Sequence, residues 1–277
     1  MTPDVSTGYS ATGRFWWVLC GTAHRYMQRQ AAYAIELLRW PLFPVLYFVA
    51  LYLTYSVSGR EMVSGYPVSG FLLVGVLGMV LWSSNLWASG YAIEFERREG
   101  TLQTLFLSPA SRSAVVLGYG AGSLIIMVGP TAIVLTSIAL LLRIEFAVAS
   151  VIAVILSILG MFIAAISLGY VLAGFFVLTR RANVIANFLQ SPVLLLSGAV
   201  LPAQELPDTL QYFARVFPLS HGMDAVRLSL LAGATPVDVM GHLVGIVCTS
   251  TILLLVGWLL LRRVERDARD GAELDYE

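Results

Sequence analysis

Six long apolar stretches, separated by short polar segments, dominate the pattern of this 277-residue chain. Each stretch is close to the length of about 20 residues that an α-helix needs to cross the hydrocarbon core of a bilayer. The pattern therefore predicts an all-α integral membrane protein with six transmembrane helices, folded as a single domain over residues 1–277. The predicted spans are 38–57, 68–93, 113–142, 147–179, 183–200 and 241–261, between an N-terminal segment 1–37 and a tail 262–277.

The composition supports a membrane protein and excludes several kinds of site. The chain is 58% hydrophobic and 12% charged, with a mean hydropathy of +0.80, which is typical of polytopic membrane proteins rather than soluble domains. All 17 basic residues are arginine, so the lysine of a phosphate-binding P-loop is missing. The two cysteines and three histidines are widely spaced along the sequence, so we expect neither a metal site nor a disulfide framework. No nucleic-acid partner is expected.

The distribution of arginine predicts how the spans are oriented. With six spans, thirteen arginines fall on the side that holds both termini and the loops after spans 2 and 4, and four fall on the other side. Positive side chains concentrate in the cytoplasmic loops of membrane proteins. We therefore expect both termini to be cytoplasmic, in a multi-pass protein surrounded by the lipid of the plasma membrane, the cytoplasmic membrane of a bacterium.

The loop between the second and third spans is more elaborate than a simple connection requires. Its first half, residues 94–99, is acidic and basic, and Gly100 then permits a sharp change of direction. Leu102, Leu105 and Phe106 follow at the spacing of one helix face, before Pro109. An apolar helix face must be buried against something. We interpret this face as a docking surface for another protein, and a helix lying on lipid is the alternative.

Two further regions outside the spans are amphipathic. Residues 14–30 place Trp16, Leu19 and Ala23 on one side of a helix, which indicates a helix lying in the membrane interface. A simple membrane anchor is the alternative there. Segments 206–216 and 220–232, separated by Pro218, are too short to span and are expected to lie at the outer face or to dip back into the membrane.

The third predicted span contains two features that affect helix packing. Gly118 and Gly122 have the spacing at which small residues allow two helices to approach closely. Pro130 is expected to kink the same helix.

Two stretches resemble ABC-2 type transporter permeases, which are membrane subunits of ABC transporters. The first is the charged run followed by Gly-Thr-Leu at 100–102 and Ser-Pro at 108–109, which is similar to the coupling-helix loop of that family. The second, within 190–228, contains Ser-Pro at 191–192, Ser-Gly at 197–198, Pro202, Pro-Leu-Ser at 218–220 and Asp-Ala-Val-Arg at 224–227. Among these permeases the chain is most similar to the daunorubicin-resistance type of drug and lipid exporters.

The resemblance implies a type V exporter-like fold with an interfacial N-terminal helix and re-entrant helices after the fifth span. It implies two permease protomers, alike or different, above two copies of a separate ABC ATPase subunit that binds ATP and magnesium. This chain would then be no enzyme and would bind no cofactor of its own. The residues implied to couple to the ATPase are Glu96, Arg97, Arg98, Glu99, Gly100, Thr101, Leu102, Leu105 and Phe106.

Neutral polar and aromatic residues within the spans are the candidates for a substrate path. The span interiors lack Asp, Glu, Lys and Arg, which argues against coupling to an ion gradient. An unpaired amide in hydrocarbon is costly, so such amides should face protein or water. The resemblance implies that spans 2 and 5 face the second protomer, so a central cavity is predicted to be bordered by Trp82, Asn85, Asn187, Phe188 and Gln190. Hydrogen bonding between helices is the alternative role for the amides.

These features together predict the permease subunit of an ATP-driven exporter that moves an amphipathic drug-like or lipid-like substrate out of the cytoplasm or the inner leaflet. Export of a lipid-linked polysaccharide or glycolipid by the same architecture is an alternative. A membrane scaffold or assembly protein is the alternative from another class.

Overall fold

The computed structural model describes residues 10–32, 34–90, 92–100, 110–179 and 182–269, and these ranges are mainly helical. A short antiparallel strand pair joins the second and third helices, with Met62 opposite Pro67 and Val63 opposite Tyr66. The elements are α1 (Ala11–Ala31), α2 (Ala34–Val57), β1 (Met62–Val63), β2 (Tyr66–Pro67), α3 (Val68–Asn85), η1 (Leu86–Gly90), α4 (Ala92–Arg98), α6 (Arg112–Leu141), α7 (Val151–Val177), α8 (Ala182–Leu196), η2 (Ala203–Glu205), α9 (Asp208–Val216), α10 (Pro218–Leu231) and α11 (Pro236–Arg269).

All six predicted apolar stretches fold as helices, and the all-α membrane fold is confirmed. Four helical segments are long and apolar enough to cross a bilayer, namely Val68–Gly90, Arg112–Leu141, Val151–Val177 and Pro236–Arg263. The other two apolar segments are shorter, at Leu42–Val57 and Ala182–Leu196. The count of six spans therefore stays a prediction, because these two segments fall below the length of about 20 residues that a perpendicular span needs.

Three predicted spans differ in detail from the helices that form. The second continues from α3 into a π-helical turn, η1, so that the helical segment ends at Gly90. The fifth ends at Leu196 instead of residue 200, because the chain turns at Gly198, whose φ of +76° favours glycine. The sixth is longer than predicted and runs as α11 from Pro236 to Arg269.

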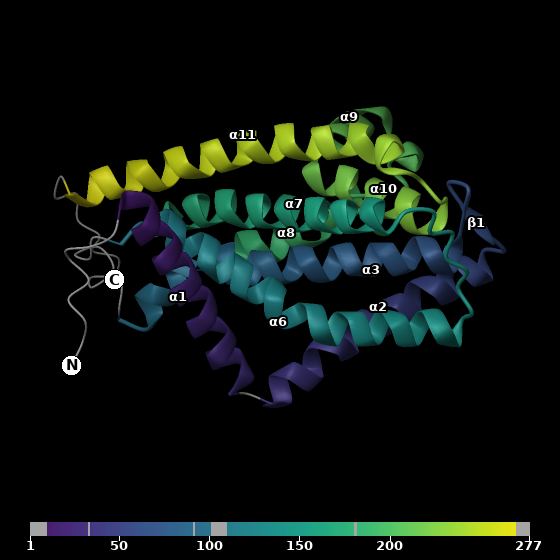
Figure 1. Ribbon diagram of the computed structural model, residues 1–277, viewed down its shortest axis with the longest axis horizontal. Helices are drawn as coiled ribbons and strands as arrows, with labels where there is room; N and C mark the ends of the chain where they lie inside the picture. Colours follow the sequence, from purple (N-terminus) through teal and green to yellow (C-terminus); the bar gives the residue numbers. More distant parts are fainter. Residues whose placement is uncertain (1–9, 33, 91, 101–109, 180–181, 270–277) are drawn as a thin grey trace.

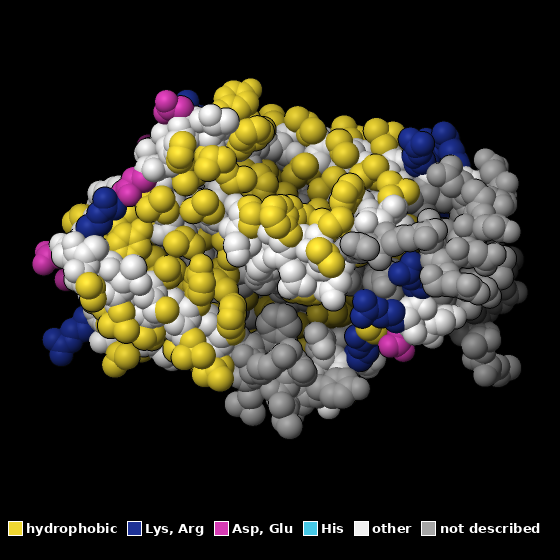
Figure 2. Space-filling model, turned by 180° about the vertical axis from the view of Figure 1, so that it is seen from behind, with side chains coloured by type: hydrophobic (Ala, Val, Ile, Leu, Met, Phe, Trp, Pro, Cys, Tyr) yellow, Lys and Arg dark blue, Asp and Glu magenta, His cyan; other side chains and the backbone are white. Residues whose placement is uncertain are grey.

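The long helices lie roughly side by side, and α1 crosses them obliquely near one end of the molecule (Figure 1). The start of α1 and the end of α11 lie at this end, whereas β1 and α9 lie at the opposite end. Hydrophobic side chains cover the middle of the face in Figure 2, and arginine, aspartate and glutamate side chains lie toward its ends. This is the surface that a bilayer requires, because hydrocarbon meets the middle and water meets both ends.

The two predicted amphipathic segments after the fifth span are confirmed as α9 and α10, with Pro218 as the first residue of α10. Helix α10 enters the bundle and packs against α7, α11 and α3. Its Leu219 and Met223 are fully buried, and its Gly222 faces Met161 of α7. Met161 is ten residues, or about 15 Å, from the start of α7. Helix α10 therefore reaches well into the layer formed by the long helices.

Candidate functional site

A buried carboxylate joins three helices at the end of the molecule where α1 crosses the bundle. Glu96 of α4 is only 4% exposed, and it accepts a hydrogen bond from the hydroxyl of Tyr119 on α6 at 2.7 Å. Its Oε1 also accepts a hydrogen bond from Nη2 of Arg25 on α1. The same Nη2 donates to the Tyr119 hydroxyl at 3.1 Å. We call Arg25, Glu96 and Tyr119 the polar triad.

The triad forms because two glycines let α1 lie directly on α6. A Cβ atom at Gly118 would stand 2.7 Å from the backbone oxygen of Leu19, and one at Gly122 would stand 2.7 Å from that of Ala23. Real Cβ contacts are not that short, so the backbones can meet only where side chains are absent. The close contact predicted from the Gly118 and Gly122 spacing is thus confirmed, and its partner is α1.

Aromatic rings enclose the triad on the protein side. Tyr26 meets Tyr119 edge to face, with the two ring centroids 5.6 Å apart. The ring centroids of Phe95 and Tyr119 are 6.2 Å apart. The guanidinium of Arg29 lies over the Phe95 ring at 3.6 Å, a contact that attracts the cation to the π face. Burial raises the pKa of Tyr26, whose hydroxyl accepts a hydrogen bond from Gln30 at 3.0 Å.

The electrostatics of the triad are asymmetric. The Arg25 side chain is 60% exposed, whereas that of Glu96 is 5% exposed. A buried carboxylate without partners would be costly, so Glu96 depends on its two donors. The triad therefore ties α4 to α1 and α6, and it does so four residues before Gly100.

The predicted coupling residues divide between the described and the undescribed parts of the chain. Arg97, Arg98 and Glu99 are exposed at the end of α4, and Gly100 has a φ of +71°, as its role in a sharp turn requires. Glu96 instead points inward. Thr101, Leu102, Leu105 and Phe106 lie outside the described residues. The sequence interpretation missed Arg25 and Tyr119 as partners of Glu96, since helical spacing does not show which helices meet.

Two of the five predicted path residues are buried inside the folded protein. Trp82 and Asn85 are 1% and 0% exposed. Asn85 donates from Nδ2 to the backbone oxygen of Leu81 at 3.2 Å. A Cβ at Gly120 of α6 or at Gly169 of α7 would lie within 3.3 Å of Asn85 side-chain atoms. Asn85 is therefore packed between α3, α6 and α7, its printed hydrogen bond stays within its own helix, and both its path role and its role in bonding between helices stay predictions.

The other three predicted path residues lie on α8. Asn187 and Phe188 are exposed, and Phe188 is 73% exposed beside the exposed Val184. Asn187 donates to the backbone oxygen of Asn183 at 2.9 Å, within its own helix. Gln190 donates from Nε2 to Oγ of Ser83 and so connects α8 to α3. The structure thus does not bring the five residues to one surface.

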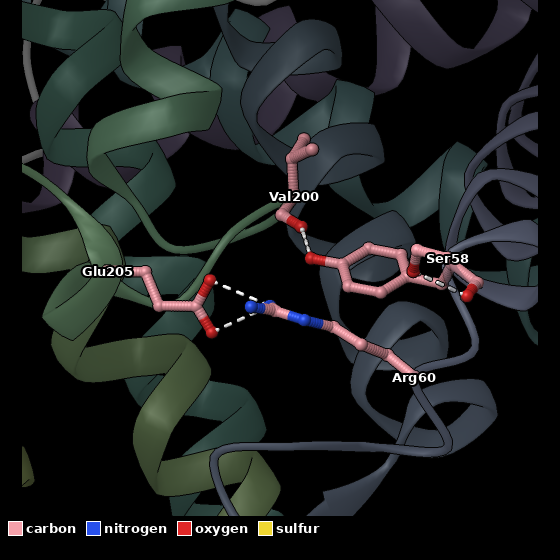
Figure 3. A network of polar contacts seen from close by, with 5 residues as sticks. Ser58, Arg60, Val200 and Glu205 are labelled. Carbon is pink, nitrogen blue, oxygen red and sulfur yellow. Dashed lines mark hydrogen bonds and ion pairs between the residues drawn. The ribbon is translucent and has the colours of Figure 1, made fainter.

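A second polar network, absent from the sequence predictions, fixes the opposite end of the molecule. Arg60 donates to both carboxylate oxygens of Glu205, at 2.8 and 3.0 Å, and Tyr55 donates to the backbone oxygen of Val200 at 2.9 Å (Figure 3). The pairing with Glu205 raises the pKa of Arg60. Buried Arg227 of α10 donates to the backbone oxygen of Gly198 at 2.7 Å and lies over the Phe71 ring. These contacts hold the turn after α8 against α2, α3 and α10.

The structure also brings together two of the histidines that are separated in the sequence. His221 of α10 and His242 of α11 have ring centroids 5.9 Å apart. Within the part of the chain that the structure describes, no group of three or more His, Cys, Asp or Glu side chains is arranged to hold a metal ion.

Comparison with known proteins identifies the family. Residues 14–231 match the family model described as ABC-2 type transporter. A segment of 74 residues, 26% of this chain, is 42% identical to Nodulation protein J of Rhizobium leguminosarum bv. trifolii, and one of 73 residues is 36% identical to Nodulation protein J of Rhizobium meliloti (strain 1021). Over 172 residues, 59% of this chain, the identity to ABC transporter G family member 20 of Dictyostelium discoideum is 26%.

These alignments cover 28% of the length of each Nodulation protein J and 22% of that of the Dictyostelium protein. The family model, by contrast, extends from α1 to the end of α10 and so includes the polar triad, the charged loop and the helices after α8. The chain is a multi-pass membrane protein that belongs to the ABC-2 type transporter family.

Proposed function

We propose that this chain is the membrane-spanning permease subunit of an ATP-driven exporter, and that α4 and the loop after it receive the movement of a separate ATPase subunit. The observation that carries the proposal is the polar triad. It fixes α4 to α1 and α6, so a force applied to the loop at 101–107 passes directly into two helices of the bundle. A loop that only connected two spans would need no such attachment.

The proposed complex contains two permease protomers and two ATPase subunits on the side of both termini. The exposed surface of α8, with Val184, Asn187 and Phe188, is the candidate for contact with the second protomer and for one wall of the path between protomers. Exposed apolar residues of α2, including Phe43 and Leu46, offer the same kind of surface. An aromatic and aliphatic wall with a few neutral polar groups suits an amphipathic drug-like or lipid-like substrate.

Export of a lipid-linked polysaccharide or glycolipid remains the second candidate, because the same apolar wall would accept its lipid part. An ATPase assay separates the two candidates. Stimulation of the reconstituted complex by amphipathic drugs or simple lipids supports the first candidate, whereas stimulation only by a lipid-linked glycan supports the second.

The test of the coupling role replaces an apolar residue of the loop by a charge. Leu102→Asp should leave a buried, unpaired carboxylate at the ATPase contact, at a cost of several kcal/mol. We expect the variant to insert in the membrane while ATPase co-purification and transport fall together. Leu102→Met keeps the apolar volume and is the matched control, which should behave like the wild type. Normal co-purification of the Leu102→Asp variant would contradict the proposal and would favour a scaffold.

A further inference from the structure

A large apolar pocket lies between α6 and α7, away from the polar triad and from the exposed face of α8. Its volume is about 510 Å³, and its walls are side chains of α3, α6 and α7, of the connection between α6 and α7, and of Leu230 on α10. The volume lies within the range of about 300–1,000 Å³ that small-molecule sites occupy. Almost all of the lining is aliphatic or aromatic, with Thr131 and Thr136 as the polar exceptions.

The course of α6 accounts for the pocket. Pro130 lies inside this helix, and proline removes a backbone hydrogen bond and bends a helix. Helix α6 changes direction partway along its length (Figure 1). Its first half packs against α1, and its second half packs against α2 and α3. The bend leaves a space beside α7 that no side chain of the described residues fills.

The pocket is at least as long as one leaflet of the hydrocarbon core is thick. Its lining on α6 runs from Met127 to Leu140. The thirteen steps between these two residues extend over about 20 Å, compared with about 15 Å for half of a hydrocarbon core. One end of the pocket is lined by Ile144, Phe146 and Val148, which belong to the connection between α6 and α7.

The two helices that line the pocket also carry exposed apolar side chains that hydrocarbon must cover. Ile133 and Leu140 of α6 and Ile155 and Leu159 of α7 have exposed fractions between 50% and 75%. Both helices are candidate membrane spans. An apolar space at this depth is poorly suited to water, which needs several polar partners to occupy a cavity.

A positive charge directly precedes the part of the connection that lines one end of the pocket. Arg143 is exposed and immediately precedes Ile144, which lines the pocket. A guanidinium group binds phosphate with charge-assisted hydrogen bonds. The exposed carboxylate of Glu145 lies two residues further on, so the connection carries one charge of each sign and the phosphate is assigned to Arg143 alone.

We propose that this pocket is a binding site for one acyl chain of a bilayer phospholipid, with the phosphate of its headgroup at Arg143. The lipid fills the space left by the bend of α6 and is a resident of the fold, not the exported substrate. The proposal goes beyond the permease function and does not depend on it, because it concerns the lipid-facing side of α6 and α7.

The test is photolabelling of the full chain in phospholipid nanodiscs that contain a phospholipid with a diazirine on one acyl chain. We expect labelling concentrated on peptides that contain residues 127–140 and 158–162, in excess of labelling on the exposed surface of α11 near Val244 and Leu255. The variant Ala132→Trp/Thr136→Trp fills the pocket from one face of α6 and should lose the excess. Ile133→Trp is exposed on the same helix outside the lining and should keep it.

Thermal unfolding provides a second measurement. Delipidation should lower the Tm of the wild type, and added phospholipid should restore it. On delipidation, the Tm of the Ala132→Trp/Thr136→Trp variant should fall by less than that of the Ile133→Trp control. Uniform labelling of all lipid-facing helices, or a filled variant that keeps the excess labelling, would overturn the proposal. Disulfide cross-linking of Thr136→Cys between two copies of the chain would do the same, because a second protomer would then occupy the pocket.

Discussion

Glu96 is the residue on which the attachment of the charged loop depends. It is the one buried member of the acidic and basic run among the described residues 95–100, and its two donors come from helices far apart in the sequence. Its neighbours Arg97, Arg98 and Glu99 are exposed at the end of α4. Glu96 therefore has a structural task, whereas Glu99, three residues later, is exposed, and its proposed part in docking stays a prediction.

Glu96→Gln tests the structural task of this carboxylate. The amide keeps the shape of the side chain but loses the charge-assisted bonds to Arg25, so we expect a loss of about 1–2 kcal/mol of stability, discounted because Arg25 is largely exposed. The Tm in detergent and transport should both fall. The control is Glu99→Gln on the exposed side, which should leave the Tm unchanged. Equal Tm values for Glu96→Gln and the wild type would show that the triad does not hold α4.

At the scale of elements, the contact between α1 and α6 decides how the N-terminal segment is attached. An interfacial helix and a simple membrane anchor are both compatible with the amphipathic sequence of 14–30. In the structure the backbone of α1 lies close to that of α6 at Gly118 and at Gly122. This approach places Arg25 of α1 beside Tyr119 of α6. Helix α1 is thus part of the packed bundle at this end of the molecule, although Trp16 and Trp17 remain exposed.

Gly122→Ala should push α1 away from α6, because the new methyl group would meet the backbone oxygen of Ala23. Overpacking of this kind costs roughly 1–3 kcal/mol. Gly129→Ala on the same helix has nothing within 4 Å of the added Cβ and should be neutral or slightly stabilising. Thermal unfolding of both variants measures the difference. A lower Tm for Gly129→Ala than for Gly122→Ala would contradict the close contact.

At the scale of the whole molecule, two polar networks lie at opposite ends of a long apolar bundle. The triad lies where α1 crosses the bundle, and the network of Arg60, Glu205 and Arg227 lies at the end that carries the strand pair and α9. This separation gives the molecule two chemically different ends. The excess of arginine on the side of the triad predicts that this end is cytoplasmic.

Cysteine labelling tests this orientation. Cys20 and Cys248 are both exposed and would first be replaced by serine. Ser64→Cys, in the turn between β1 and β2, and Ala203→Cys, in η2, should react with an impermeant thiol reagent in intact cells. Glu99→Cys and Ser111→Cys should react only after the cells are opened. Labelling of the last two variants in intact cells would reverse the topology and place the charged loop away from any cytoplasmic ATPase.

Hydropathy and local chemistry made several elements of this fold predictable. The apolar runs became helices, the pieces around Pro218 became α9 and α10, and Gly100 adopts the positive φ that its position suggested. Helix ends were less predictable. The π-helical turn after Asn85 and the early end of α8 at Leu196 depend on packing against other helices, and hydropathy carries no signal for either.

The sequence by itself determined that this is a helical membrane protein of the ABC-2 type, because span length, arginine distribution and loop motifs are all local properties of the chain. Only the tertiary structure decided which side chains meet. It turned Glu96 inward to Arg25 and Tyr119, buried Asn85 against α6 and α7, and opened a pocket beside the bend of α6. The physical reason is that in a chain this apolar every helix could pack against several others. The choice among them is made by small features such as Gly118 and Gly122, whose effect depends on the partner helix they meet.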